Sequence, residues 1–270
     1  MIMENATQHP VDVTVLIAAY DRLSFLKEAV ASALAQDYGS FEVLVIDDGS
    51  GQETRDWLDE QANSENHLRV IHQQNSGIAR ARQAGLIAAR GQLVCILDSD
   101  DRFLPGALRS IMAFFIASTP VDLVYTNNMH QMPSGVLRNC TYPHYATNRA
   151  MIRGVLLRPR IPFKHSGTTF CRDVALDLGG YDAELPIKVD VDLYLRFLAA
   201  GRKLCLLDAP VVAFRVHKNS VSRRRLLGIR VWCQLIDRYG PRSRLARIGY
   251  KASRVSAELL KLATERVQCV

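Results

Sequence analysis

The chain has 270 residues and a mass of 30.2 kDa, with 48% hydrophobic and 23% charged residues. This composition is close to that of an average soluble domain, and it excludes a disordered tail, a collagen-like fibre and a small disulfide scaffold. The net charge of +7 is unevenly spread, because residues 215–270 hold fourteen basic and three acidic side chains while the preceding residues hold twenty and twenty-four. We therefore expect a basic C-terminal segment on a slightly acidic domain, and no nucleic-acid partner.

The sequence predicts neither a membrane span nor an export signal. No apolar run approaches the roughly 18 to 20 residues that a spanning helix needs, and residues 1–10 lack the apolar centre of a signal peptide. The six cysteines form no C-x-x-C pair, so we expect reduced, packed thiols. These features predict a cytoplasmic protein with a flexible N-terminus at residues 1–10.

From residue 11 to residue 127, short apolar runs alternate with amphipathic segments. This rhythm is typical of βα units and of a mostly parallel sheet. Ser50 and Glu53 form an S-x-x-E pattern that predicts a capping box at the start of the second helix. Further helices are expected at 77–89 and from Pro105 onward. The expected strands are 13–18, 41–46, 68–72, 93–97 and 121–125.

The next stretch, residues 127–164, contains several prolines and no clean periodicity, so it predicts irregular structure. Regular patterns return after it. We expect a strand at 167–171, a short helix to residue 178, a helix at 190–200, and two strands at 203–207 and 211–216. This order indicates a mixed sheet.

Two helices are predicted after the three arginines 223–225. The second carries one apolar stripe with basic residues beside it. Such a stripe usually packs on its own domain, but it can also lie on an anionic membrane or bind a partner, so peripheral membrane contact is one expectation. The stripe consists of Leu245, Ile248, Ala252, Val255, Leu259 and Leu262.

Acidic residues follow two of the predicted strands, as Asp47-Asp48 and as Asp98-Ser99-Asp100. In an open α/β sheet, the carboxyl ends of the strands border the ligand crevice. Carboxylates two residues apart can share a divalent cation, and Mg²⁺ or Mn²⁺ prefers oxygen ligands together with substrate phosphates. The D-x-D sequence is therefore a candidate metal site.

Two later motifs also hold candidate residues. Asp190-Val191-Asp192 opens a predicted helix, where N-capping is the ordinary interpretation. His217 ends the last predicted strand, where it either has a structural role or completes a metal site.

A dinucleotide-binding enzyme is an alternative, because residues 49–54 form a partial G-x-G-x-x-G with Thr54 in the last place. The preceding Asp47 and Asp48 argue against this alternative, since their charge would repel a pyrophosphate at the helix N-terminus. The first βα turn, residues 18–22, contains no glycine. A nucleotidyltransferase that makes nucleotide sugars would normally show a glycine- and basic-rich loop at that turn.

In their order along the chain, these motifs resemble glycosyltransferase family 2, whose members are inverting enzymes with the nucleotide-sugar-binding GT-A fold. The resemblance runs from Val13 to about Ser222. The segments that carry it are Ala18-Ala19-Tyr20-Asp21-Arg22, Val45-Ile46-Asp47-Asp48-Gly49-Ser50, Asn75-Ser76-Gly77, Ala81-Arg82-Gln83-Ala84-Gly85, Leu97-Asp98-Ser99-Asp100-Asp101, Gly179-Gly180-Tyr181-Asp182, Asp190-Val191-Asp192-Leu193-Tyr194-Leu195-Arg196 and Arg215-Val216-His217-Lys218-Asn219-Ser220-Val221-Ser222.

The resemblance implies an α/β protein with a GT-A (Rossmann-like) fold, a mixed, mostly parallel sheet flanked by helices, and a basic helical extension at 223–270. The GT-A domain would cover 11–222, with a nucleotide-binding half at 11–127 and an acceptor and catalytic half at 128–222. A sugar would pass from a nucleotide-sugar donor, for which we expect a UDP-sugar, to a hydroxyl of a glycan or glycolipid acceptor. Such enzymes often work at the inner face of a membrane.

The resemblance also implies roles for single residues. A divalent cation, Mn²⁺ or Mg²⁺, would be held by Asp98 and Asp100 with His217 as a further ligand, and Asp190 would be the general base. The nucleotide would contact Ala18, Tyr20, Asp48, Arg82, Asp98 and Ser99.

The chain departs from the family pattern at three places. Val189 stands where the family usually has Glu, Ser76 replaces a frequent glycine and Gln83 replaces a frequent Asn. Because Val189 is atypical, we keep a second hypothesis, a catalytically inactive GT-A-like scaffold that binds a membrane or a partner through its basic tail.

Overall fold

The computed structural model describes residues 11–118, 120–216 and 225–267. The flexible segment expected at residues 1–10 and the domain boundary expected after residue 222 lie outside these ranges. In chain order the elements are β1 (Val13–Ala19), α1 (Leu23–Leu34), β2 (Phe41–Asp47), α2 (Gln52–Ser64), β3 (Leu68–His72), α3 (Ile78–Ala88), β4 (Leu93–Ile96), β5 (Arg102–Phe103), α4 (Ala107–Ala117), β6 (Leu123–Gln131), β7 (Leu137–Cys140), α5 (Asn148–Leu157), β8 (Thr169–Cys171), α6 (Arg172–Asp177), α7 (Val189–Ala199), β9 (Leu204–Arg215), α8 (Arg225–Tyr239) and α9 (Arg244–Val267).

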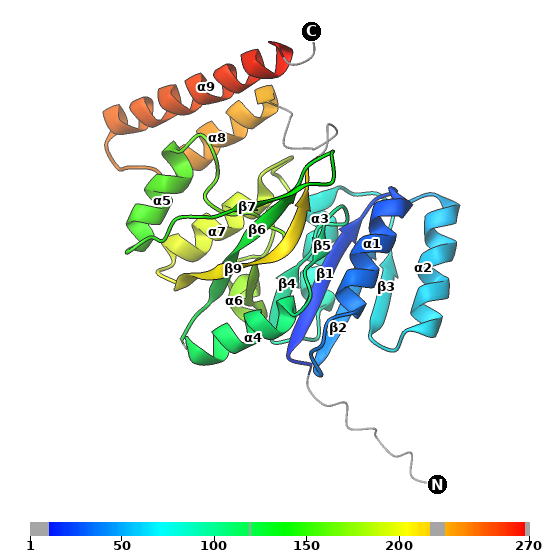
Figure 1. The fold of residues 1–270 in the computed structure, drawn as a ribbon. Coiled ribbons are helices and arrows are strands. Elements are labelled where there is room, and N and C mark those ends of the chain that lie inside the picture. The colour runs from blue at the N-terminus through cyan, green and yellow to red at the C-terminus, as the bar shows by residue number, and fades with distance from the viewer. Residues whose placement is uncertain (1–10, 119, 217–224, 268–270) are drawn as a thin grey trace.

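Within the described ranges, the strands form one nine-stranded mixed sheet in the order β3-β2-β1-β4-β8-β6-β9-β5, with β7 paired to β6 (Figure 1). Strands β3, β2, β1 and β4 are all parallel, so their carboxyl ends meet at one edge. Strand β8 is antiparallel to both β4 and β6 and joins the two parts of the sheet. The expected α/β architecture is confirmed.

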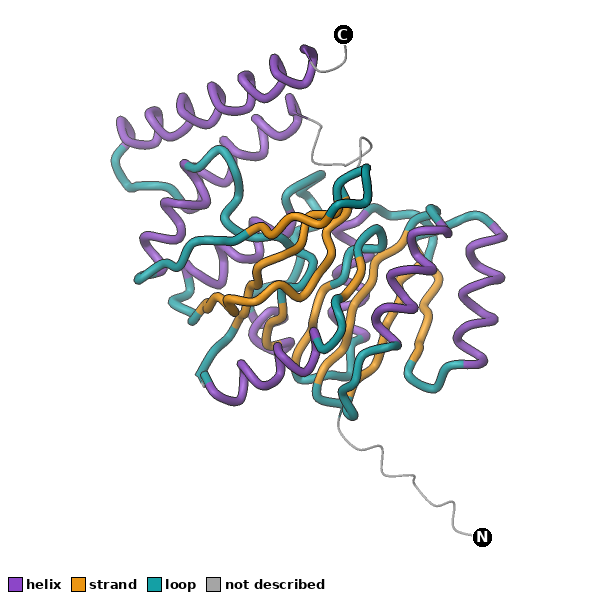
Figure 2. The backbone as a smooth tube through the Cα atoms, in the orientation of Figure 1, coloured by secondary structure: helices purple, strands orange, loops and turns teal. Residues whose placement is uncertain are grey.

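Helices cover both faces of the sheet and make three layers (Figure 2). Successive residues of β1 point to opposite faces, as the pleat of a strand requires. Val15 and Ile17 belong to a core cluster that also contains buried residues of α1, α2 and α4. Leu16 belongs to the other cluster, which contains buried residues of α3, α5, α7 and α8.

The prediction of irregular structure at residues 127–164 is wrong in part. Strand β6 continues to Gln131 and pairs with β7, and α5 follows within the same stretch. The side chain of Thr147 caps α5 by accepting a hydrogen bond from the Ala150 N–H at 3.1 Å. The part of β6 beyond the predicted strand contains the buried polar residues Thr126, Asn127 and Asn128. Because these residues are polar, no hydrophobic alternation marks this part as a strand.

One continuous strand, β9, replaces the two strands expected at 203–207 and 211–216. Its pairing with β6 shifts register on both sides of Asn127, which lies opposite Pro210. A bulge of this kind admits a proline, which cannot donate to the ladder. The proline that predicted a break therefore marks an irregularity inside one strand.

The predicted capping box at Ser50 and Glu53 is wrong. The N-cap of α2 is Gly51, and no side chain caps it. The Ser50 hydroxyl instead accepts the Asp21 N–H at 2.8 Å, and so joins the turn after β1 to the turn after β2. This hydrogen bond joins residues that are 29 positions apart, so the local S-x-x-E pattern could not predict it.

The two C-terminal helices lie beside α5 and α7 (Figure 1). On α8, the side chains of Val231, Trp232, Leu235 and Ile236 are buried in the same core cluster as Leu16 of β1. Helix α8 is thus part of the domain core. No helix among the described residues is long and apolar enough to cross a membrane.

Candidate functional site

The turn after β1 brings two predicted segments together. Asp21 and Arg22 both have left-handed backbones, with φ of 53° and 57°. The Asp21 carboxylate accepts the Gly51 N–H at 2.9 Å. Arg22 Nη1 lies 3.2 Å from Asp100 Oδ2, so the turn also reaches the D-x-D segment. Tyr20, a predicted nucleotide contact, leaves the same turn with 55% of its surface exposed.

This geometry also bears on the dinucleotide alternative. The N-terminus of α2, where a pyrophosphate would bind, already faces the Asp21 carboxylate through the Gly51 N–H. Gly49 has φ of 82°, and a Cβ there would lie 2.7 Å from the Asn75 backbone nitrogen. The glycine therefore permits close packing of two loops.

Asp48 organises the loop before α3. Its carboxylate accepts hydrogen bonds from the Gln73 side chain at 2.7 Å, the Ser76 N–H at 2.8 Å and the Gly77 N–H at 2.9 Å. The Ser76 hydroxyl adds a fourth bond at 3.2 Å, which gives a local role to the serine that replaces a frequent glycine. Asp48 thus fixes the backbone that begins the helix of Arg82.

The D-x-D turn contacts α3 through an ion pair. Arg82 Nη2 donates to Asp98 Oδ1 at 2.6 Å. Burial raises the pKa of Asp98, the nearby charges of Asp100 and Asp190 raise it further, and Arg82 opposes both effects. Burial likewise opposes the charge of Arg82, but Asp98 and Asp190 outweigh it and raise the pKa of the guanidinium. Arg82, Asp98 and Asp190 therefore form one charge cluster.

Asp101 and Arg215 hold the far side of the same turn. The buried Asp101 carboxylate accepts the Arg215 N–H at 2.8 Å, and Arg215 Nε donates to the Asp100 carbonyl at 3.1 Å. Burial, with the charges of Asp98 and Asp100, raises the pKa of Asp101 well above its usual range. The arginine of the R-x-H segment thus meets the D-x-D turn, while His217 lies outside the described residues.

Asp190 lies in the first turn of α7 and is half-buried. Its carboxylate has no hydrogen-bond partner within the part of the chain that the structure describes. Lys188, two residues earlier, has a left-handed backbone with φ of 61°. Burial lowers the pKa of Lys188 to about 8, although Glu258 and Asp190 favour its charged form. Val189 between them is buried in the hydrophobic core, so an apolar side chain fits this position.

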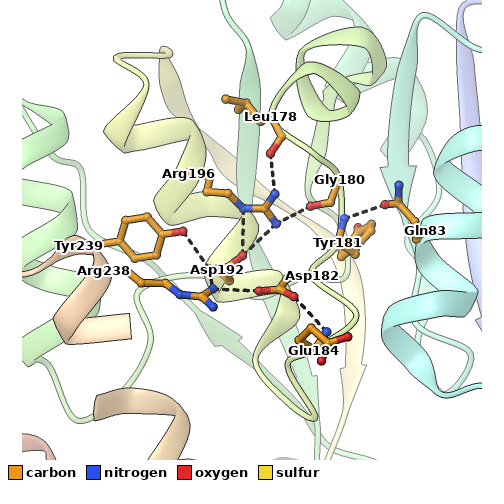
Figure 3. Close-up of polar contacts among 10 residues, drawn as sticks. All are labelled: Gln83, Leu178, Gly180, Tyr181, Asp182, Glu184, Asp192, Arg196, Arg238 and Tyr239. Carbon is orange, nitrogen blue, oxygen red and sulfur yellow. Dashed lines mark hydrogen bonds and ion pairs between the residues drawn. The ribbon is translucent and has the colours of Figure 1, made fainter. Parts of the chain in front are cut away.

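Asp192 has a structural role, different from the N-capping that the sequence suggested. Its buried carboxylate accepts Arg196 Nε at 2.9 Å and the Tyr239 hydroxyl at 2.9 Å (Figure 3). Arg196 also donates to the carbonyls of Leu178 and Gly180, which fixes the loop before α7. The N-cap of α7 is Lys188.

Two further residues in Figure 3, Gln83 and Arg238, tie this loop to the rest of the site. Gln83, which replaces a frequent Asn, accepts the Tyr181 N–H at 2.7 Å and so joins α3 to the loop. Arg238 of α8 lies 2.8 Å from Asp182 and 3.4 Å from Asp192. The loop that leads to Asp190 is therefore held from α3, α7 and α8 together.

A buried polar group near this cluster has no signal in the sequence. The His165 ring bonds the hydroxyls of Tyr194 and Tyr181, the latter at 3.0 Å. Burial lowers the pKa of His165 well below its usual range, and the charge of Arg82 lowers it further. A neutral imidazole donates to one tyrosine and accepts from the other. The motif Gly-Gly-Tyr pointed to Tyr181, but no pattern in the proline-rich stretch marked His165.

The structure thus places Asp98, Arg82 and Asp190 together, with Asp100 on the same turn as Asp98. Ala18 and Ser99 are half-buried at the ends of β1 and β4, and Asp48 supports the α3 loop. Among the described residues, no group of three or more His, Cys, Asp or Glu side chains could hold a metal ion. A cation would therefore depend on the D-x-D carboxylates and on ligands from a substrate.

Comparisons with known proteins identify the family. The model described as Glycosyl transferase family 2 matches residues 14–178. The succinoglycan biosynthesis protein ExoU of Rhizobium meliloti is 29% identical over 224 residues, which are 79% of this chain and 64% of ExoU. Across the curated relatives compared, the chain covers between 15% and 64% of the relative's length.

Solved structures show the same fold. S. aureus TarS 1–349 in complex with UDP-GlcNAc superposes with a TM-score of 0.68 at 16% identity, over 92% of this chain and 72% of that one. The mannosyltransferase PcManGT of Pyrobaculum calidifontis, in complex with GDP-Man and Mn²⁺, gives a TM-score of 0.64 at 17% identity, over 96% and 76%. The family match covers more than half of the chain, and it shows that the chain belongs to glycosyltransferase family 2.

Proposed function

We propose that the protein is an inverting glycosyltransferase that moves a sugar from a UDP-sugar to a hydroxyl of a glycan or glycolipid acceptor. The observation that carries this proposal is the charge cluster of Arg82, Asp98 and Asp190, drawn from three separate elements to one edge of the sheet. The family and the UDP-GlcNAc complex of TarS support a nucleotide-sugar donor. A cytoplasmic location remains part of the proposal.

Asp190 acts as the general base in this proposal. It takes the proton of the acceptor hydroxyl while that oxygen forms a bond to the anomeric carbon. The bond between the anomeric carbon and the diphosphate oxygen breaks on the opposite face, so the configuration inverts and the diphosphate leaves with the electron pair. The carboxylate suits this role, since it has no hydrogen-bond partner within the described residues that would hold it elsewhere.

Asp98 and Asp100 are the proposed ligands of a divalent cation, Mn²⁺ or Mg²⁺. The fit rests on charge, because burial and then the nearby carboxylates of Asp100 and Asp190 raise the pKa of Asp98, which a cation would offset. Arg82 bonds only one oxygen of Asp98, Oδ1. When bound, the cation would stabilise the charge that gathers on the leaving diphosphate. The Mn²⁺ complex of PcManGT supports this assignment, and His217 stays a proposed further ligand.

The nucleotide is proposed to lie along the edge between the turn after β1 and α3. Tyr20 is exposed and free to pack on the base, with Ala18 behind it and Ser99 at the D-x-D turn. Arg82 would lie near the ribose or the phosphates. The proposed bond from Asp48 to the base would have to share a carboxylate that already accepts four bonds within the loop.

Nucleotide binding is the first test. Calorimetry should measure UDP, GDP and TDP with and without Mn²⁺, on the wild type and on Asp100→Ala, with Asp173→Ala as an exposed acidic control. We expect one nucleotide, UDP, to bind in a Mn²⁺-dependent way, and Asp100→Ala to lose this dependence while Asp173→Ala keeps it. Absence of binding by all three nucleotides would favour the inactive scaffold.

Turnover of Asp190→Asn is the second test. This variant keeps the size of the side chain but removes the base, so transfer should fall by about 10²–10⁴-fold while nucleotide affinity stays unchanged. Transfer would be measured as the release of UDP from the UDP-sugar, and calorimetry would measure the nucleotide affinity of the same variant. Full transfer activity in the variant would contradict the mechanism.

A further inference from the structure

Helix α9 docks on the domain by its charged side. Arg254 and Glu258 are buried, although both are charged. The Arg254 guanidinium lies 3.5 Å from the centroid of the Trp232 ring and donates to the Arg158 carbonyl. Lys261 Nζ lies 2.8 Å from Glu258 and donates to the Pro159 carbonyl at 2.5 Å. These contacts fix the rotation of α9 about its axis.

Most of the apolar stripe therefore faces outward, against the expectation that it packs on its own domain, and only Val255 and Leu262 are half-buried. Leu245 is 81% exposed, Ile248 54%, Leu259 47% and the neighbouring Leu260 67%, and Ala252 is also exposed. Spacings of three, four and seven residues put Leu245, Ile248, Ala252 and Leu259 on one side of the helix. Figure 1 shows α9 as the outermost layer of the molecule. An exposed apolar row of this kind marks an interaction surface.

Positive charge accompanies the stripe. Arg242 precedes α9 and Arg244 begins it; both are exposed, and neither has a carboxylate partner among the described residues. Among the described side chains of α9, Glu258 is the sole carboxylate, and it is buried. Among the described side chains, the outward side thus offers apolar groups and two arginines without a carboxylate partner, but no carboxylate. A second copy of the chain would bring a surface of the same sign against it.

We propose that the outward face of α9 binds the surface of a membrane that contains anionic lipids, with the helix axis parallel to the membrane. Apolar side chains would enter the boundary of the acyl chains while the arginines contact the headgroups. This proposal goes beyond the transfer reaction and does not depend on it. The face consists of Leu245, Ile248, Ala252, Leu259 and Leu260, with Arg242 and Arg244.

Flotation with vesicles tests the proposal on the full chain. Vesicles of phosphatidylcholine alone are compared with vesicles that contain phosphatidylglycerol, at low and high salt. We expect binding to the anionic vesicles that weakens with salt. Leu245→Asp with Ile248→Asp should abolish it, and Arg242→Gln with Arg244→Gln should weaken it by roughly fivefold for each arginine removed.

Matched variants on other faces provide the controls. Ile116→Asp, at a side chain of 76% exposure on α4, and Arg55→Gln with Arg90→Gln should bind vesicles as the wild type does. Equal loss of binding in these controls would overturn the proposal, as would a wild type that binds no vesicle. Sedimentation that shows a dimer lost in Leu245→Asp with Ile248→Asp would also overturn it, because a second copy would then cover the face.

Discussion

Asp190 and Asp192 lie two residues apart on the first turn of α7, yet their surroundings differ. Asp192 is 1% exposed and accepts bonds from Arg196 and Tyr239, whereas Asp190 is half-buried within the charge cluster of Arg82 and Asp98. A carboxylate that is fully engaged cannot take a proton from a substrate without breaking those bonds. The two residues therefore separate a structural role from the proposed catalytic one.

Asp192→Asn is expected to destabilise the protein. The substitution leaves the Arg196 guanidinium without its charged partner at a buried site, which costs about 2–4 kcal/mol of unfolding free energy. Urea unfolding followed by circular dichroism measures the change. Asp173→Asn serves as control, because its ion pair with Arg172 is exposed. This substitution should change the free energy of unfolding by less than about 0.5 kcal/mol. Equal midpoints for Asp192→Asn and the wild type would contradict the structural role.

Site residues that lie in motifs with a fixed spacing could be predicted from the sequence, and site residues outside such motifs could not. Asp98 and Arg82 were found because each lies in a segment that resembles the family. His165 lies in a segment without periodicity, and its two tyrosine partners come from 16 and 29 residues further along the chain. Only the folded chain brings these three rings together.

The contact between α3 and the sheet depends on Gly85. A Cβ at this position would clash with Leu16 Cδ1, and would lie 2.9 Å from Leu16 Cδ2 and 3.0 Å from Ile46 Cγ1. We expect Gly85→Ala to lower the unfolding free energy by about 1–3 kcal/mol, since the helix must move away from β1 and β2. Gly249→Ala is the matched control, because this helical glycine of α9 has open space around it. Gly249→Ala should raise the free energy of unfolding by about 0.5–1 kcal/mol, because alanine favours a helix more than glycine does. A stabilised Gly85→Ala would contradict the packing.

His72 joins β3 to two other elements. Its ring nitrogens lie 2.7 Å from Asp47 of β2 and 2.9 Å from Asp59 of α2. Burial opposes the imidazolium, but the bonds to Asp47 and Asp59 outweigh it and raise the pKa of His72. Burial also opposes the Asp47 carboxylate, but bonds from Ser50 and His72 outweigh it and lower the pKa of Asp47.

The pair should therefore stabilise the fold most in weakly acidic solution. The contribution of His72 is complete below its unfolded pKa of about 6.5 and is lost as pH rises through the higher folded pKa. The contribution of Asp47 is present above about pH 3.9 and is lost at more acidic pH. We expect His72→Gln to reduce stability more at pH 5.5 than at pH 9 in urea unfolding. The exposed His144→Gln should show no such difference, and a pH-independent effect of His72→Gln would contradict the assignment.

Elements with strong hydrophobic periodicity could be predicted from the sequence, as β1, β2 and β3 show. The rest of the fold depends on contacts between distant segments. Strand β9 passes Pro210 because β6 supplies a bulged partner, and α5 forms between prolines because Thr147 caps it. On α9, periodicity identified the stripe correctly, but the bonds of Arg254 and Lys261 decide which side faces the domain.

The whole molecule should unfold as one cooperative unit, because α8 shares a core cluster with β1 and contacts the loop before α7. The chain has two tryptophans, so Trp57→Phe leaves the buried Trp232 of α8 as the single reporter. We expect its fluorescence and the far-ultraviolet circular dichroism of the same variant to change at the same denaturant concentration. A fluorescence transition at lower denaturant would show that α8 and α9 unfold separately.

Cooperativity also links the nucleotide-binding edge to the C-terminal helices. A ligand that binds only the folded state stabilises the whole unit, by about 2.7 kcal/mol at a hundred times its Kd. The nucleotide that binds in calorimetry should therefore raise the unfolding midpoint reported by Trp232, although α8 lies outside the proposed nucleotide contacts. Anionic vesicles should raise the same midpoint in the wild type and not in Leu245→Asp with Ile248→Asp. The nucleotide and the vesicles would then stabilise the same core from different surfaces. A substitution at one surface would abolish the effect of one ligand and leave the effect of the other unchanged.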